Sequence, residues 1–130
     1  MLNILKHPIT RWSATSAYAA MIATLSLVPG RTASALALPI PYFDKLAHAV
    51  MHGLFALLLC WALQYHLRHK AWLVFAFVFC VLYGIIMEFA QFKFVAVDRS
   101  FSWGDIAANT VGVLAAIVFL GITHKRNRPS

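Results

Sequence analysis

The stretch YGIIMEFAQFKFVAVDRSFSWGDIAANTVG, from Tyr83 to Gly112, combines long apolar runs with acidic residues. Three of the four carboxylates of the chain lie within it, at Glu88, Asp98 and Asp105. Ionisable side chains in apolar segments are costly unless they pair, face a cavity or take part in function. We therefore expect this stretch to carry both the helix packing and the functional face of the protein.

The composition of the 130-residue chain is that of a membrane protein. Hydrophobic residues make up 62% and charged residues 12%, whereas a soluble domain carries roughly a quarter charged residues. The 11 Lys and Arg against 4 Asp and Glu would suggest nucleic acid in a soluble protein. Here most basic residues flank apolar segments, where they anchor helices and set topology. The composition predicts one membrane domain and no nucleic-acid partner.

Four apolar segments each approach the length of about 20 residues that crosses a bilayer. They cover about residues 12–28, 44–65, 71–91 and 104–123, between an N-terminal segment 1–11 and a basic tail 124–130. The sequence therefore predicts an all-α fold, a four-helix transmembrane bundle that occupies residues 12–123. The natural partner of such a bundle is the lipid bilayer.

The first segment is rich in Ala, Ser and Thr, which let helix backbones approach closely in a bilayer. We expect a packed, retained helix there. A cleaved signal peptide is the competing interpretation, because Ala35-Leu36-Ala37 has the small-x-small pattern of a cleavage site. The segment is weakly hydrophobic and long for a signal peptide, which favours retention.

The basic residues predict the orientation in the membrane. With the N terminus inside, seven of them fall on the cytoplasmic side and four on the outer side. The inner set is Lys6, Arg11, Arg68, Lys70, Lys125, Arg126 and Arg128, and the outer set is Arg31, Lys45, Lys93 and Arg99. We expect both termini in the cytoplasm of a multi-pass protein of the plasma (inner) membrane.

On that topology, all four carboxylates fall on the outer side of the membrane. Residues three or four apart share a helix face, so polar residues line one face of each of three segments. The faces are Asp44, His48 and His52 on the second segment, Gly84, Glu88 and Gln91 on the third, and Asp105, Asn109 and Gly112 on the fourth. Their convergence would form a shallow polar pocket open to the outside, with Lys45 and Arg99 supplying opposite charge.

A purely structural interpretation stays open beside this one. Asp105 can be a helix-start carboxylate that the helix dipole stabilises, with Ser102 three residues earlier as its cap partner. An ion pair of Glu88 with Arg99 would hold helices together without any further function.

His48 and His52 have the HxxxH spacing that suits a divalent metal, with Asp44, Glu88 or Asp105 as oxygen ligands. The pattern lacks the glutamate of an HExxH motif, and a hydrogen-bonded interfacial histidine is the usual alternative. The sequence contains no GxSxG elbow and no phosphate-binding glycine loop. The identity of a cofactor and the existence of an enzymatic reaction stay open.

Three blocks of the sequence resemble the VanZ-like family of small integral membrane proteins. They are DKLAH (Asp44–His48), GIIMEFAQ (Gly84–Gln91) and RSFSWGDIAANTVG (Arg99–Gly112). Order, spacing and membrane placement match the family pattern over about residues 40–122. His52 departs from it, because family members more often carry an aromatic residue such as Tyr there, and this argues against a shared ligand. The family is named for a member associated with teicoplanin resistance, which implies a cell-envelope context and no particular reaction.

Two main functions remain, and a transporter is a weaker third, because four helices with no broken segment or inverted repeat are few for alternating access unless the protein oligomerises. In the first, the outer polar site binds or modifies an envelope component, such as a lipid-linked cell-wall intermediate or a phospholipid headgroup. The catalytic candidates are Asp44, His48, Glu88 and Asp105, and the substrate-binding candidates are Lys45, Gln91, Arg99 and Asn109. In the second, the chain is a non-enzymatic scaffold whose polar residues hold the helices together and dock a partner. Assembly into homo-oligomers is compatible with both.

Overall fold

The computed structural model describes residues 5–29, 39–64, 66–67, 70–95 and 100–126. Within these ranges the chain forms four long helices and no strand. The helices are α2 (Pro8–Ser26), α4 (Phe43–Leu63), α5 (Ala71–Phe94) and α6 (Trp103–Arg126). The predicted all-α fold is confirmed for this part of the chain.

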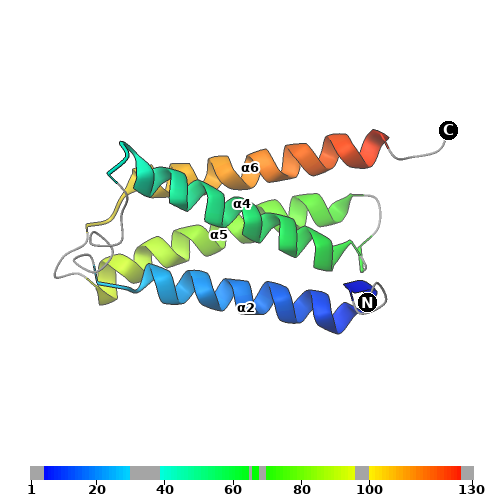
Figure 1. Ribbon diagram of the computed structural model, residues 1–130, viewed down its shortest axis with the longest axis horizontal. Coiled ribbons are helices and arrows are strands. Elements are labelled where there is room, and N and C mark those ends of the chain that lie inside the picture. The colour runs from blue at the N-terminus through cyan, green and yellow to red at the C-terminus, as the bar shows by residue number, and fades with distance from the viewer. Residues whose placement is uncertain (1–4, 30–38, 65, 68–69, 96–99, 127–130) are drawn as a thin grey trace.

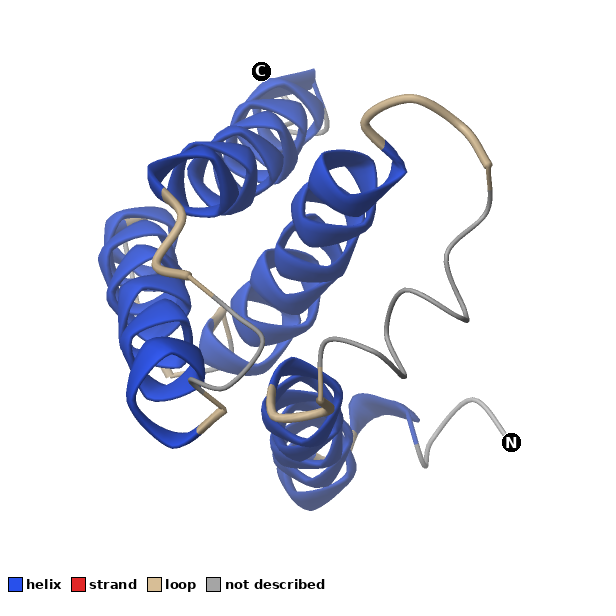
Figure 2. Cartoon of the chain, turned by 90° about the vertical axis from the view of Figure 1, so that its left-hand side faces the viewer, coloured by secondary structure: helices blue, strands red, loops and turns tan. Residues whose placement is uncertain are grey.

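The helices form a bundle in which successive helices run in opposite directions, so α2 begins and α6 ends at the same end (Figure 1). α4 contacts all three other helices and packs most extensively against α6, whereas α2 and α6 make no contact within the described ranges. Viewed from one end, the four helices pack side by side (Figure 2). Because α4 and α6 are separated by one antiparallel helix, they run parallel and both begin at the same end.

Three of the helices are long and apolar enough to cross a membrane: α4, α5 and the Trp103–His124 part of α6. α2 is not among them, because Ser, Thr and Arg interrupt its 19 residues. It nevertheless packs against the bundle. The Thr15 hydroxyl donates to the Leu58 carbonyl at 3.1 Å, and the Tyr83 hydroxyl donates to the Ala19 carbonyl at 2.6 Å.

The first helix begins at Pro8, earlier than the predicted start at Trp12. Proline suits the first turn because its missing N–H would have no helical partner there. The imidazole of His7 accepts a hydrogen bond from the Ile9 backbone at 3.4 Å and caps the helix. The signal-peptide pattern at 35–37 lies outside the described residues.

The middle of the bundle is an apolar core. Phe55 is 1% exposed, and its ring centroid lies 5.1 Å from that of Tyr83 on α5 and 6.5 Å from that of Tyr18 on α2. Ile22 of α2 and Val113 of α6 are fully buried in the same cluster. All four helices therefore contribute side chains to one core, which fixes their relative positions.

A close backbone contact joins α4 to α6. A Cβ added to Gly112 would lie 1.9 Å from the carbonyl oxygen of Ala49, and one added to Gly53 would lie 3.1 Å from the carbonyl oxygen of Gly112. Small residues allow helix backbones to approach this closely in membrane bundles. The contact lies about two to three turns from the start of each helix and sets their register.

We expect Gly112→Ala to destabilise the protein by about 3 kcal/mol, the upper end of the cost of overpacking, because the clash is with backbone atoms that have no alternative rotamer. Gly121→Ala is the matched control on the same helix, since nothing lies within 4 Å of its added Cβ. Thermal unfolding in detergent measures both variants. A Gly112→Ala variant as stable as Gly121→Ala would contradict the contact.

Candidate functional site

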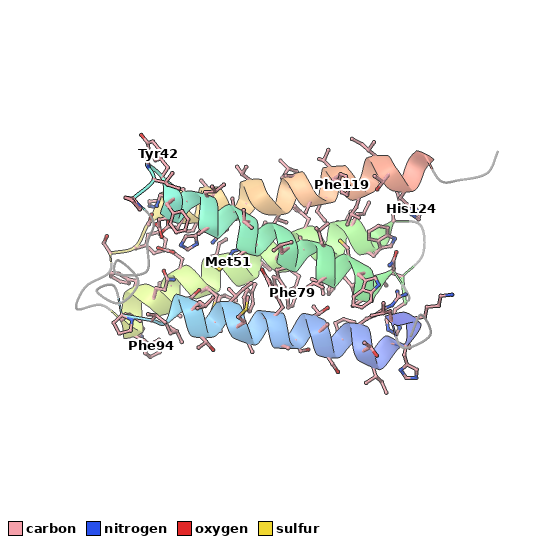
Figure 3. All side chains as sticks on the ribbon, in the orientation of Figure 1. Tyr42, Met51, Phe79, Phe94, Phe119 and His124 are labelled. Atoms are coloured by element: carbon pink, nitrogen blue, oxygen red, sulfur yellow. The ribbon has the colours of Figure 1, made fainter. Side chains whose placement is uncertain are left out.

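Polar side chains gather at the end of the bundle where α4 and α6 begin and α5 ends. Tyr42 and Phe94 mark this end in Figure 3, and His124 marks the opposite end. We call the group the polar cluster; its members are Asp44, Lys45, His48, Glu88, Ser102, Asp105 and Asn109. Three helix faces therefore meet here, and six of the eight candidate residues from the sequence belong to the cluster.

An ion pair ties α4 to α6 within the cluster. The Lys45 ammonium binds the carboxylate of Asp105 and also lies 3.6 Å from that of Asp44. It donates a further hydrogen bond to the Ser102 hydroxyl at 3.3 Å. The Asp105 side chain is 9% exposed, while those of Lys45 and Asp44 are 39% and 64% exposed. The buried carboxylate thus has the cationic partner that burial requires, and the rest of the charge reaches the surface.

His48 is the buried ring at the centre of the cluster. Its Nδ1 lies 3.1 Å from the amide oxygen of Asn109. Because an amide oxygen only accepts, this contact is a hydrogen bond in the tautomer that carries the proton on Nδ1. The other nitrogen, Nε2, lies 3.9 Å from a carboxylate oxygen of Asp44 and 3.9 Å from one of Asp105. Nε2 therefore faces the two carboxylates.

Glu88 joins the end of α5 to the start of α6. It is 2% exposed, and its carboxylate accepts a hydrogen bond from the Ser102 backbone N–H at 2.7 Å. The Ser102 hydroxyl in turn accepts from the Asp105 N–H at 3.2 Å and caps α6. The predicted cap is present in the structure.

Ser102 is the member of the cluster that sequence reasoning did not select as a site residue. It contacts Lys45, Glu88 and Asp105 together. The available signal was the S-x-x-D spacing of a helix start, which indicates a cap and gives no information about the lysine on another helix.

Two parallel helices begin at the polar cluster, and their starts stabilise the carboxylates that lie there. The backbone N–H groups of a helix start carry partial positive charge. Asp44 and Asp105 lie in the first turns of α4 and α6, respectively. Helix starts are also common binding sites for phosphate.

A small cavity of about 90 Å³ opens beside the cluster between α2, α4 and α5. It is lined by Leu25, Ser26, Asp44, Ala47, His48, Met51 and Gln91. Its volume is that of about three water molecules at roughly 30 Å³ each. Gln91 is 4% exposed and reaches the site through this cavity. Arg99 and Asp98 lie outside the described residues.

His52 stands apart from the cluster. Its Nδ1 binds the His48 backbone carbonyl at 3.2 Å, and its Nε2 is buried without a hydrogen-bond partner. A Cβ on Gly84 would lie 3.3 Å from that Nε2. One ring nitrogen is used by its own helix and the other abuts α5, so His48 and His52 do not form a joint metal site.

A different group has the geometry for a cation: Asp44, His48 and Asp105 each offer one ligand atom within 4.8 Å of the others. Mixed carboxylate and imidazole ligands suit a divalent transition metal. The Lys45 ammonium, however, already binds Asp105 and approaches Asp44. A divalent ion would therefore have to displace Lys45.

Comparison with known proteins identifies the family. A family model described as VanZ/LLP1 matches residues 2–124, which includes all of α2, α4 and α5, nearly all of α6, and the whole polar cluster. The chain belongs to this family. No curated protein and no solved structure matches the chain. Together with the three helices of membrane-spanning length, the family establishes a VanZ-like integral membrane protein.

We expect the free energy of unfolding of Glu88→Gln to lie within about 1 kcal/mol of the wild-type value, because the amide oxygen still accepts a hydrogen bond from the Ser102 N–H. Glu88→Leu leaves that N–H without an acceptor, which costs about 1–3 kcal/mol. Thermal unfolding of both variants in the same detergent tests the difference. Equal stabilities of the two variants would show that the hydrogen bond does not hold α5 to α6.

Proposed function

We propose that this VanZ family member crosses the plasma membrane four times, with α2 as the additional span, both termini in the cytoplasm and the polar cluster on the outer side. The excess of basic residues at the opposite end supports this orientation. The 19 residues of α2 give a helix of about 28 Å, close to the thickness of the hydrocarbon core. Its contacts with α4 and α5 place it alongside helices that span.

Cysteine labelling in intact cells tests the orientation. Cys60 and Cys80 are buried at 1% and 0% exposure, so an introduced exposed cysteine gives the main signal. Ser100→Cys, at the end with the cluster, should react with a membrane-impermeant maleimide, and Gln64→Cys, at the other end, should react only after permeabilisation. The reverse pattern would place the cluster in the cytoplasm.

The function we propose is binding, or modification, of the phosphate-bearing headgroup of an envelope lipid at the polar cluster. The observation that carries it is the pair of adjacent charges Asp44 and Lys45, which are exposed at one end of the bundle and lie next to buried His48 and Asp105. A phospholipid and a lipid-linked cell-wall intermediate share this chemistry. Intramembrane ionisable groups that reach a surface are functional by default.

Each group has a chemical role in this proposal. Lys45 and Arg99 bind phosphate oxygens through charge-assisted hydrogen bonds. His48 exchanges protons through Nε2, and Asp44 and Asp105 stabilise positive charge beside it. Glu88 and Asn109 orient the start of α6 and the His48 ring, while Gln91 contacts ligand from the small cavity.

The scaffold function also has an observation in its favour. The contacts Lys45–Asp105, His48–Asn109 and Glu88–Ser102 join three helices, as interhelical polar contacts do in stable bundles. The two functions predict different effects when the charge of Lys45 is removed. A scaffold needs the hydrogen bonds alone, whereas a headgroup site needs the lysine charge.

Native mass spectrometry measures lipid binding to the purified chain, with phosphatidylethanolamine and separately with a polyprenyl phosphate. The comparison distinguishes a phospholipid from a lipid-linked cell-wall intermediate as the ligand. We expect the double variant Lys45→Gln/Asp105→Asn, which leaves neither partner of the ion pair charged, to bind the preferred lipid about tenfold more weakly, since a hydrogen bond to a charged group contributes about 1.5–3 kcal/mol. Lys93→Gln, an exposed lysine at the same end of the bundle, is the control. Equal binding by both variants at unchanged stability would favour the scaffold.

A further inference from the structure

A second concave feature lies on the other side of α4 from the small cavity. It is an apolar groove of about 410 Å³ between α4 and α6. Its lining residues are Ala49, Val50, Gly53, Leu54, Leu57, Val111, Gly112, Ala115, Ala116 and Phe119. None of them belongs to the polar cluster.

The groove leads directly away from the polar cluster. Lys45, Ala49 and Gly53 follow at i, i+4 and i+8 and so share one face of α4. The Lys45 side chain also lies over the start of α6, because its Cε would be 3.1 Å from a Cβ on Gly104. The Lys45 ammonium therefore lies at the end of the α4–α6 contact where both helices begin. The groove lies further along both helices, toward their C-terminal ends.

We infer that the groove holds one acyl chain of a phospholipid whose headgroup binds at Lys45 and Asp44. The inference rests on the proposed headgroup site and narrows its ligand. Exposed charges of both signs, 3.6 Å apart, complement a headgroup that carries both signs. An aminoethyl phosphate group fits this requirement, with its phosphate on Lys45 and its ammonium on Asp44.

The position of the groove suits an acyl chain. From Ala49 to Leu57 it extends about 12 Å along α4 at a rise of 1.5 Å per residue, and it begins about 6 Å below Lys45. A chain that starts at the headgroup crosses one leaflet, about 15 Å of the roughly 30 Å core. The groove volume equals that of about fourteen water molecules at roughly 30 Å³ each, and a methylene group is of similar size.

The same features argue against a second copy of the chain in the groove. The two glycines are already used in the contact between α4 and α6. The walls Val50, Leu54, Val111 and Phe119 are 46–63% exposed, but the groove between them covers only about 12 Å. A transmembrane helix of about 20 residues would pack along about 30 Å.

The test uses the full chain in vesicles of phosphatidylethanolamine and phosphatidylglycerol. A trace of phosphatidylethanolamine carries a photoactivatable diazirine near the end of one acyl chain, and crosslinked residues are mapped by peptide mass spectrometry. We expect labelling at Leu54 and Phe119 to exceed labelling at Val74 and Ile86 several-fold. The latter two are 68% and 59% exposed on α5 and report contact with bulk lipid.

Two variants fill the groove from opposite sides, Ala115→Leu on α6 and Val50→Phe on α4. Both positions are exposed, so neither change enters the core. Each should lower labelling at Leu54 and Phe119 several-fold. Ala20→Leu makes the same substitution as the first at an exposed position of α2 and should leave labelling unchanged. A phosphatidylglycerol probe with the same chains should label the groove several-fold less.

The outcomes separate the two proposals. Equal labelling of α5 and the groove overturns the acyl-chain inference, and so does groove labelling that the filling variants leave unchanged. In either case, lipid binding that depends on Lys45 would still support the headgroup site. Crosslinks between two copies of the chain at the groove also overturn it, in favour of a dimer. If lipid binding does not depend on Lys45, the headgroup site fails, and the inference fails with it whatever the chain probe labels.

Discussion

The backbone contact between α4 and α6 at Ala49 and Gly112 is the constraint on which the polar cluster depends. The two helices run parallel, and their cross-helix partners keep a nearly constant separation in sequence. Lys45 meets Asp105 60 residues later, and His48 meets Asn109 61 residues later. A shift of α6 by one turn, about 5.4 Å, would separate both pairs at once. Gly112 prevents that shift, because only a residue without a Cβ fits against the Ala49 carbonyl.

Parallel packing also concentrates charge at one end of the bundle. Two helix starts place their positive partial charges beside Asp44 and Asp105, which stabilises both carboxylates. Glu88 is in the opposite situation, since it lies in the last turns of α5, where the helix dipole disfavours an anion. The Ser102 N–H that it accepts belongs to the start of α6 and offsets this cost. Asp44 and Asp105 are therefore stabilised by the starts of their own helices, whereas Glu88 depends on a contact with the start of α6.

The sequence was sufficient to predict four helices and the polar faces of three of them, but it did not predict which side chains pair. Helical periodicity places Asp44 with His48, and Asp105 with Asn109, on one face each. Apolar length predicts four spans, of which α4, α5 and α6 are long and apolar enough to cross a membrane. Neither pattern gives the rotation of a side chain. His52 satisfied the HxxxH spacing, yet its ring binds its own helix and abuts Gly84. Ser102 had only the signal of a cap, because its contact with Lys45 depends on how α4 and α6 pair.

The groove has the same origin as the contact. Glycine and alanine between α4 and α6 let the two backbones approach, but they leave the space beside the contact unfilled. Larger residues such as Val111 and Phe119 also line that space. Different substitutions can nevertheless change the helix contact and the groove separately. Gly112 is buried against backbone, whereas Ala115 is exposed on the groove floor. The close contact therefore constrains the first position, whereas the second borders the space in which the proposed lipid chain lies below Lys45.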